Sequence, residues 1–396
     1  MNFFFEKIKN KKDSQSDFII FDDTNSNLIQ QIIPQGYTFS IFKTRPVELI
    51  LFPSILLKIL KNIIFLRPFQ KFASNKNFIT NILWQLLCIY IKSYIELANP
   101  KAVITSIDNC TKFAWLSKNI SDIPFIAIQN GFRLSHAINI KEIYHCQHLF
   151  CFGKFEVDNF PKRKWTVNNF YPVGSLNSSL YFKERHANNS DKNEFDFLVI
   201  SCWRGNIGFA KDVKDSMKAM RIFDQEFAAY LKEKDLKVAI ILRSERDSDQ
   251  WIMPEIGMSE EEYFQSIYGK SVILLDTDLK IRNVYSIMQK SNVILAAFPS
   301  TCLFEALGIE KKVLFCDFTN NDKYFSDIKS QILYKHSKGS KDLFYQKLNS
   351  LLSISQKEYL IDFKDVMNYY AHPNLLDKTN ELISKKIDKI IKSKNK

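Results

Sequence analysis

A pair of hydroxyl residues followed by a carboxylate is the most chemically suggestive group in this sequence. Ser300 and Thr301 follow an apolar run, residues 293–297, and open a predicted helix that carries Glu305 one turn later. Hydroxyl oxygens accept hydrogen bonds from the free N–H groups of a helix start, and those N–H groups with the helix dipole attract anions. The pattern fits a nucleotide phosphate site in which Glu305 contacts a sugar hydroxyl. It fits a capped helix without a ligand equally well.

Two arginines lie where predicted strands of the second half end. Arg243 follows the apolar run 236–242, and Arg204 follows the run 195–201. The planar guanidinium can bond two phosphate oxygens, so both are candidates for holding a donor phosphate. The alternative for each is a surface ion pair, and Arg243 has Glu245 close by in the sequence.

The first half offers a carboxylate in a comparable position. Asp108 follows the predicted strand 102–107 and precedes a predicted helix, residues 111–118. Ligands of doubly wound sheets gather beyond the carboxyl ends of the strands, which makes Asp108 the first candidate for a catalytic acid, base or nucleophile. The alternative is a cap on the helix that follows.

The next strand end carries polar side chains as well. Gln129, Asn130 and Arg133 follow the predicted strand 124–128, and His136 comes three residues later. These four are candidates for contacting a ligand at this strand end; the family resemblance described below implies that they position an acceptor or the donor sugar. The spacing of the histidines that follow matches no metal-binding helix.

Alternating strands and helices predict an α/β fold with two doubly wound, Rossmann-like domains that face a cleft. We predict a first domain over residues 1–176, a polar linker over 177–194, a second domain over 195–376 and a C-terminal helix over 377–396. The last segment combines an isoleucine stripe with a lysine-rich face, so we expect it to pack back across the two domains.

Residues 47–66 form the most apolar window of the chain. Glu48, Lys58 and Lys61 interrupt it, and Pro53 falls near its middle, which argues against a membrane span. We favour two buried or half-buried helical segments. The alternative is a helix that lies in the plane of a membrane with Lys58 and Lys61 on its polar side.

Composition narrows the class of protein. The 396 residues carry a net charge of +12, much of it in lysines near the two ends. No nucleic-acid-binding signature accompanies the charge, so we expect solvated tails or a weak peripheral attraction to an anionic inner membrane. Seven cysteines without a CxxC pair and the lack of a signal-peptide pattern favour a cytoplasmic protein with reduced thiols.

One motif has the residue spacing of a metal-binding site. Asp276, Thr277 and Asp278 have a DxD spacing, which binds metal in some other proteins. They fall between a predicted strand and a predicted helix, where turn and capping roles are common. We therefore predict no metal and no other cofactor.

Several motifs taken together resemble one family. They are FIIFDDTNSNLI with the later KTRPVEL, then ITSIDNCTKFAWLS, FIAIQNGFR, YPVGS and SNVILAAFPSTCLFEALG, scattered over residues 17–309. In their order and spacing they resemble GT-B-fold glycosyltransferases of bacterial capsule, O-antigen and other surface-carbohydrate synthesis. The segment Gln129–Phe132 also resembles the Glu-Asp-Gly-Phe segment of capsule Kdo transferases, which use a CMP-activated donor. Here both carboxylates are amides, and an amide cannot be the nucleophile.

The resemblance implies a nucleotide-sugar donor in the second domain and a glycan or glycolipid acceptor in the first. Ser300 and Thr301 would hold the donor phosphate with Arg204 and Arg243, and Glu305 would contact the ribose. Three alternatives stay open: a nucleotide-sugar epimerase, a polyol-phosphate transferase that uses His136 and His372, and a non-catalytic scaffold in polysaccharide assembly.

Overall fold

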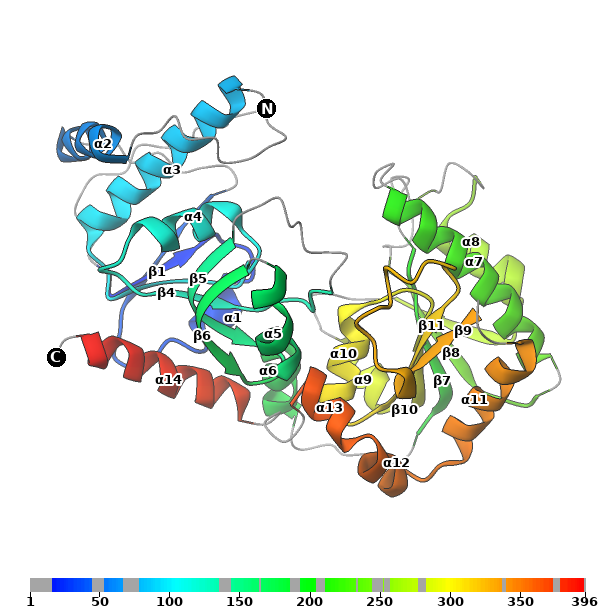
Figure 1. Cartoon of the computed structure of the whole chain (residues 1–396). Coiled ribbons are helices and arrows are strands. Elements are labelled where there is room, and N and C mark those ends of the chain that lie inside the picture. Colours follow the sequence, from blue (N-terminus) through cyan, green and yellow to red (C-terminus); the bar gives the residue numbers. More distant parts are fainter. Residues whose placement is uncertain are drawn as a thin grey trace. The chain divides into compact units, whose positions relative to one another are not determined.

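The structure is a computed structural model in which two compact units can be described. The described residues are 16–44, 53–66, 78–134, 144–163, 165–185, 193–203, 211–232, 234–243, 252, 257–276, 283–336, 340–372 and 378–394. The first unit comprises Met1–Gly131, Ile138–Ser179 and Asp377–Lys396, and the second comprises Phe132–Ala137 and Leu180–Leu376 (Figure 1).

The first unit is built on a parallel sheet of six strands in the order β2-β1-β3-β4-β5-β6. The short apolar runs of its central strands β1, β3 and β4 are buried on both faces, as expected of a parallel sheet covered by helices. The strands are β1 (Phe18–Phe21), β2 (Phe39–Phe42), β3 (Ala102–Thr105), β4 (Phe125–Ile128), β5 (Tyr144–Cys151) and β6 (Trp165–Pro172).

Helices cover this sheet and extend beyond it. The second half of α3 supplies buried residues such as Ile91 and Ile95 to the core beneath the sheet. The helices are α1 (Ser26–Gln30), α2 (Pro53–Leu66), α3 (Phe78–Ala98), α4 (Thr111–Asn119), α5 (Lys154–Asn159) with the 3-10 turn η3 (Pro161–Arg163), and α14 (Thr379–Lys394).

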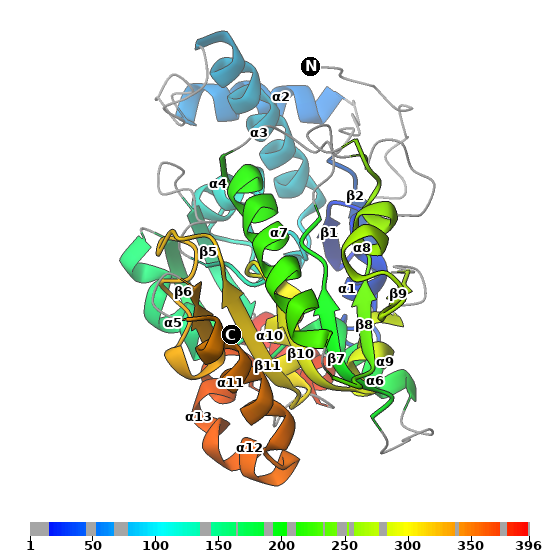
Figure 2. The ribbon, with the colours of Figure 1, turned by 90° about the vertical axis from the view of Figure 1, so that its right-hand side faces the viewer.

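The second unit repeats the architecture with the strand order β12-β11-β10-β7-β8-β9, again entirely parallel. Counted from β7, this is the 3-2-1-4-5-6 order of Rossmann-like domains. Figure 2 shows β11, β10, β7 and β8 side by side. The strands are β7 (Phe195–Ile200), β8 (Val238–Ile241), β9 (Val272–Leu275), β10 (Ser291–Ala296), β11 (Lys312–Asp317) and β12 (Leu333–Lys335).

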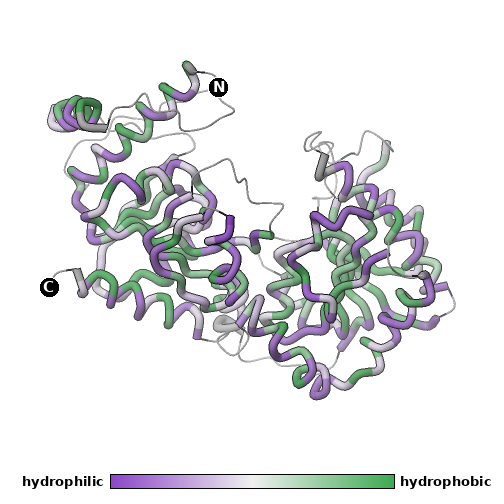
Figure 3. Tube along the Cα trace, in the orientation of Figure 1, coloured by the Kyte–Doolittle hydropathy of each residue, from purple (hydrophilic) through white to green (hydrophobic). Residues whose placement is uncertain are grey.

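The helices of the second unit follow the alternation that the sequence predicts, with an added group after β12. They are α7 (Lys211–Leu231), α8 (Glu260–Tyr268), α9 (Asn283–Gln289), α10 (Thr301–Gly308), the turn η5 (Ser330–Ile332), α11 (Lys341–Ser353), α12 (Gln356–Asp362) and α13 (Lys364–Tyr370). Apolar segments follow the strands of both sheets in Figure 3. The predicted α/β fold of two doubly wound domains is confirmed.

One expectation needs correction. The predicted linker begins as a helix, α6 (Leu176–Arg185), because Leu176, Leu180 and Tyr181 bury one stripe beneath its polar residues. The predicted break at Pro53 falls at the edge of the described residues, because α2 is described from Pro53 onward and residues 45–52 lie outside the described part of the chain.

The C-terminal helix belongs to the first unit. Ile383, Ile387 and Ile391 are buried there, and the Thr379 hydroxyl donates to the carbonyl of Val173 at 2.6 Å. Tyr37 donates to the Asp388 carboxylate at 3.2 Å on the same helix. The predicted isoleucine stripe is therefore the docking face of α14.

Candidate functional site

The second sheet has a topological switch point between β7 and β10. The chain runs outward from β7 in one direction through β8 and β9, and in the other through β10, β11 and β12. Ligands of open α/β sheets bind outside the carboxyl ends of the strands at such a point. The Cys202 thiol, just after β7, donates to the carbonyl of Phe298, just after β10, at 3.7 Å. This contact joins the two loops that form the switch point.

The N-terminus of α10 opens at this point. Ser300 is the N-cap residue, and its side-chain oxygen accepts a hydrogen bond from the backbone N–H of Cys302 at 3.4 Å. The Thr301 hydroxyl accepts the backbone N–H of Phe132, a residue of the same unit, at 3.1 Å. The predicted helix cap is confirmed, and both hydroxyls lie half-buried at the start of the helix.

Two further candidates, Glu305 and Arg243, influence the pKa of Cys302 in the first turn of this helix. Burial, with a smaller contribution from the Glu305 carboxylate, raises the pKa of the Cys302 thiol to about 12, and the positive charge of Arg243 acts in the opposite direction. The three side chains are thus near enough to influence one another. The Arg243 side chain is exposed, while its backbone N–H donates to both carboxylate oxygens of buried Glu260 at 2.9 and 3.0 Å. Glu305 itself is only 5% exposed.

Phe132, inside the segment expected to position a sugar, has a packing role. Its ring stacks on Phe304 of α10 with 3.6 Å between centroids and contacts Tyr370 edge-on at 5.8 Å. The neighbouring Arg133 is half-buried. The sequence indicated a polar motif here but gave no sign that its aromatic residue belongs to the packing of α10.

The first sheet has its own switch point, between β1 and β3. Asp22 follows β1 with a positive φ of 80° and is buried. Its carboxylate accepts the Thr24 backbone N–H at 3.0 Å, the Thr24 hydroxyl at 2.7 Å and the hydroxyl of Thr44. Lys112 donates to the Thr44 carbonyl at 3.2 Å. We did not predict this cluster, although the pair Asp22-Asp23 directly after a buried strand was a visible signal.

Asp108 lies in the loop that follows β3, at the same edge of the sheet. It is buried, and one carboxylate oxygen accepts the backbone N–H of Asn130 at 3.4 Å. The N-cap position of α4 is occupied by Cys110, so Asp108 does not take the capping position that was its alternative role. The structure thus brings Asp108 and Asn130 together, as expected of adjacent strand ends.

The side-chain amide of Gln129 is hydrogen-bonded within the protein through both its nitrogen and its oxygen. Its nitrogen donates to the Glu156 carboxylate and to the Gly131 carbonyl, both at 3.0 Å, and its oxygen accepts the N–H of Phe152 at 3.1 Å. Gln129 is also buried. The geometry gives it a structural role as a link between β4 and the start of α5, rather than a contact to a sugar.

Glu156 is a buried carboxyl group that the sequence analysis missed. It is 0% exposed, and its second oxygen accepts the backbone N–H of Gly153 at 3.0 Å. Burial raises its pKa to about 8, with a further contribution from the charge of Asp108. The G-x-x-E spacing of a capping box directly after a strand was the sequence signal for it.

We expect Glu156→Gln to flatten the pH dependence of stability. The folded pKa of Glu156 lies above its ordinary value of 4.5, so the folded state keeps a proton that the unfolded state releases between about pH 4.5 and 8. The free energy of unfolding therefore falls as pH rises through that window and levels off above it. Urea titrations at pH 5 and pH 8 should show a loss about 1–3 kcal/mol larger in the wild type than in the variant.

Asp224 supplies the control for this measurement. Burial raises its pKa to about 7, so it titrates in the same window and leaves a residual slope in both proteins. Only the difference between wild type and variant reports Glu156. Identical slopes would show that the Glu156 carboxyl is ionised throughout.

Several predicted residues cannot be placed. Arg204, His136, Thr277 and Asp278 lie outside the described residues. Asp276 is exposed directly after β9. Within the described ranges, no group of three or more histidine, cysteine, aspartate or glutamate side chains is arranged to hold a metal ion. His372, named for the polyol-phosphate alternative, is half-buried after α13, and burial lowers its pKa.

A cavity of about 460 Å³ lies elsewhere in the first unit. Ser117, Pro124, His145, Gln147 and Ile390 are among its lining residues. Pro124 immediately precedes β4, so the cavity lies toward the amino-terminal edge of the sheet, away from Asp108. None of the predicted site residues lines it.

No family model and no curated protein matches this sequence. Solved structures match over most of its length. The UDP-GlcNAc 2-epimerase from Neisseria meningitidis bound to UDP-GlcNAc is 14% identical with a TM-score of 0.50, covering 94% of this chain and 99% of that one. The UDP-N-acetylglucosamine 2-epimerase from Rickettsia bellii is 13% identical, with a TM-score of 0.50 and 95% of each chain covered.

A glycosyltransferase from Rickettsia africae ESF-5 also matches, with 11% identity, a TM-score of 0.48 and coverage of 94% of this chain and 99% of that one. At these identities the likeness concerns the fold. Two parallel six-stranded sheets, each flanked by helices, together with the two epimerase matches at a TM-score of 0.50, define the chain as a protein of the GT-B fold.

Proposed function

We propose that this protein is a glycosyltransferase that moves a sugar from a nucleotide-activated donor to a bacterial surface polysaccharide or a lipid-linked glycan. The observation that carries the proposal is the start of α10 at the switch point of the second sheet, where the positive charge of Arg243 lowers the pKa of the Cys302 thiol in the first turn. A helix N-terminus and an arginine there suit the phosphates of a nucleotide sugar.

The proposed binding site for the nucleotide-sugar donor is formed by residues of the second unit. Ser300 and Thr301 would present hydroxyls and backbone N–H groups to the phosphates, and Arg243 would balance their charge. Glu305 is nearly buried, so its contact to the ribose would involve one carboxylate edge. Arg204 remains a second phosphate ligand predicted from the sequence alone.

The acceptor half uses the first unit. In the proposed step Asp108 accepts the proton of the acceptor hydroxyl while that oxygen bonds to the anomeric carbon of the sugar. The bond from that carbon to the phosphate breaks, and the nucleotide leaves with the electron pair. Asn130 of the first unit would position the acceptor or a donor carboxylate. Arg133 and His136, whose segment belongs to the second unit, keep the same role as predictions from the sequence.

The second candidate is a nucleotide-sugar epimerase. It is supported by the fold likeness to two UDP-GlcNAc 2-epimerases and by the neighbouring acidic groups Asp108 and Glu156. An epimerase needs acid and base groups that both reach one sugar, however. Both carboxylate oxygens of Glu156 already accept hydrogen bonds within the protein, from Gln129 and Gly153. We therefore favour transfer.

A panel of nucleotides tests the donor site. Purified protein should be stabilised by one of CMP, UDP, GDP, CDP or ADP, because a ligand that binds only the folded state raises stability by about 2.7 kcal/mol at a hundredfold excess over its Kd. A rise in Tm with CMP points to a CMP-activated ulosonic acid, and a rise with UDP or GDP points to a hexose. No rise with any nucleotide would count against the proposal and favour a scaffold.

A further inference from the structure

Helix α2 has apolar side chains on two sides: Ile55, Ile59 and Ile63 pack against the core of the first unit, and a second set of apolar side chains is exposed. Leu57 is 70% exposed and Ile64 is 75% exposed, and Leu56 and Leu60 are exposed beside them. At about 100° per residue these four side chains share one arc of roughly 100° on the helix. We call these four residues the α2 apolar face. Figure 1 shows α2 at the periphery of the first unit, beside α3, and Figure 3 shows its apolar segments.

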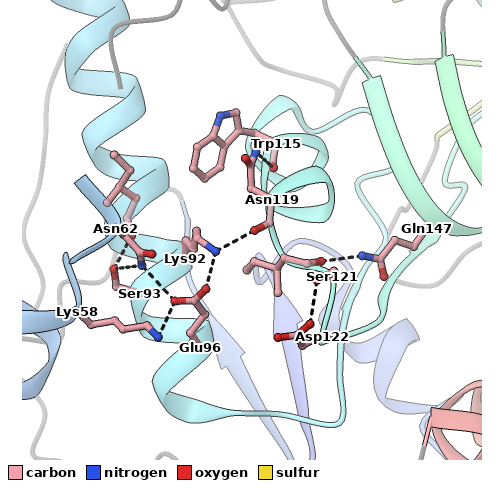
Figure 4. A network of polar contacts seen from close by, with 12 residues as sticks. Lys58, Asn62, Lys92, Ser93, Glu96, Trp115, Asn119, Ser121, Asp122 and Gln147 are labelled. Atoms are coloured by element: carbon pink, nitrogen blue, oxygen red, sulfur yellow. Dashed lines mark hydrogen bonds and ion pairs between the residues drawn. The ribbon is translucent and has the colours of Figure 1, made fainter. Parts of the chain in front are cut away.

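Two polar side chains of α2, Lys58 and Asn62, point away from this face, toward α3. Asn62 is buried and donates to the Ser93 hydroxyl at 2.9 Å and to the Glu96 carboxylate at 3.1 Å. Lys58 pairs with the same carboxylate at 3.0 Å. Figure 4 shows this network between the two helices. Lys58 therefore does not belong to an outward polar side, as one sequence-based alternative had supposed.

The network continues toward the core, which fixes the orientation of α2. Lys92 pairs with Glu96 and donates to the carbonyl of Asn119, the last residue of α4, at 2.8 Å (Figure 4). Burial would raise the pKa of Glu96, but the hydrogen bonds from Lys92, Asn62 and Lys58 lower it, so the carboxylate stays ionised. Rotating α2 to hide its leucines would break these bonds and leave a half-buried charge.

Helix α3 repeats the pattern over its first turns. Ile79, Leu83 and Leu86 follow one another at spacings of four and three residues and are exposed. Side chains at these spacings lie on one helix face. Clustered apolar side chains on a surface mark interaction sites, whereas single ones are ordinary.

We propose that the α2 apolar face inserts into the headgroup region of an anionic lipid bilayer, with α2 lying in the plane of the membrane. At 14 residues α2 is about 21 Å long, and no helix among the described residues has the length and apolar character needed to cross a membrane. In-plane insertion is the mode open to such a helix.

Two observations favour lipid over a protein partner. All four side chains of the face are aliphatic, whereas the anchors of protein interfaces are enriched in tryptophan, tyrosine and arginine. Lys61 is exposed beside the face, and the chain carries a net charge of +12, which complements anionic headgroups. The inference is independent of the proposed sugar transfer.

Co-sedimentation with vesicles tests it. The full chain, without nucleotide, is mixed with vesicles of phosphatidylcholine alone or with one third phosphatidylglycerol. We expect binding that is stronger to the anionic vesicles and falls with salt. The variant Leu57→Gln with Leu60→Gln and Ile64→Gln should bind more than about tenfold more weakly. Lys61→Gln should weaken binding to the anionic vesicles only.

Matched controls lie in the second unit. Leu343→Gln with Ile361→Gln replaces exposed apolar residues of α11 and α12, and Lys357→Gln replaces an exposed lysine of α12. Neither control should change vesicle binding. Lack of binding by the wild type, or equal losses in the control variants, would overturn the inference. So would a concentration-dependent dimer without lipid that the triple variant abolishes, because the face would then bind a second copy.

Discussion

Asp108→Asn should reduce the rate of sugar transfer by about 10²–10⁴-fold and leave nucleotide affinity unchanged. Asp108 lies at the carboxyl edge of the first sheet, and its proposed role is to accept the proton of the acceptor hydroxyl. Asparagine keeps the size of the side chain and an oxygen for the N–H of Asn130, but it cannot take a proton. The effect should appear in kcat, because the lost interaction forms only during the chemical step.

The matched control for this variant is Asp122→Asn. Asp122 is an exposed aspartate of the same unit that precedes β4, at the opposite edge of the sheet. Its replacement should leave kcat within about twofold of wild type, as expected for a surface substitution. Circular dichroism and thermal unfolding of both variants establish that the fold is intact. Undiminished turnover by Asp108→Asn would remove Asp108 from the mechanism.

Replacement of the phosphate ligands should give the second large effect. Arg243→Ala should weaken nucleotide binding about 10–100-fold, since a hydrogen bond to a charged group contributes about 1.5–3 kcal/mol. Ser300→Ala with Thr301→Ala should weaken it by a further factor of about ten, because the hydroxyls are lost from the start of α10. Isothermal titration calorimetry with the nucleotide found by the panel measures both changes.

Helix capping has to be separated from ligand binding in this experiment. Ser300→Ala also removes an N-cap, which costs about 1 kcal/mol of stability by itself. Ser355 is the N-cap of α12 in the same unit, where it accepts the Glu358 N–H at 3.2 Å. Ser355→Ala should lower stability by a similar amount and leave nucleotide affinity unchanged. If all these variants bind nucleotide like wild type, the site lies elsewhere.

Much of the fold could be predicted because its strands are short, wholly apolar runs bounded by turn residues. The runs at Phe18–Phe21 and Phe125–Ile128 are examples, since a buried parallel strand needs no polar alternation. Helix α6 was mistaken for a linker because three apolar residues, Leu176, Leu180 and Tyr181, are its buried stripe and serines surround them. Three apolar residues among polar ones are too weak a pattern to predict a helix from the sequence.

The candidate site was predictable in part. Strand ends placed Asp108, Arg243 and Ser300 on the carboxyl edges of their sheets, and the cap at Ser300 is confirmed. The pairing order of the strands is set by contacts between distant segments, so the two switch points could not be derived from local patterns. The burial of Gln129 and Glu156 escaped prediction for the same reason, because each is fixed by the other.

The outward leucines of α2 show a limit of hydrophobic patterning. The window was expected to form buried or half-buried helical segments, and the described part, α2, is half-buried. The pattern did not show which side of α2 faces the protein, because that side is set by α3, where Glu96 binds Lys58 and Asn62. Only the position of Glu96, thirty-odd residues away, reveals which side of α2 is polar and buried.

The most direct test of the central claim is the consumption of a nucleotide sugar with and without an acceptor. Wild-type protein is incubated with the nucleotide sugar that the binding panel selects, with and without a lipid-linked glycan, and released nucleotide and sugar products are measured by NMR and mass spectrometry. We expect nucleotide release that requires the acceptor, with one sugar added to the glycan. An epimerised nucleotide sugar formed without acceptor, or no consumption under either condition, would contradict glycosyl transfer.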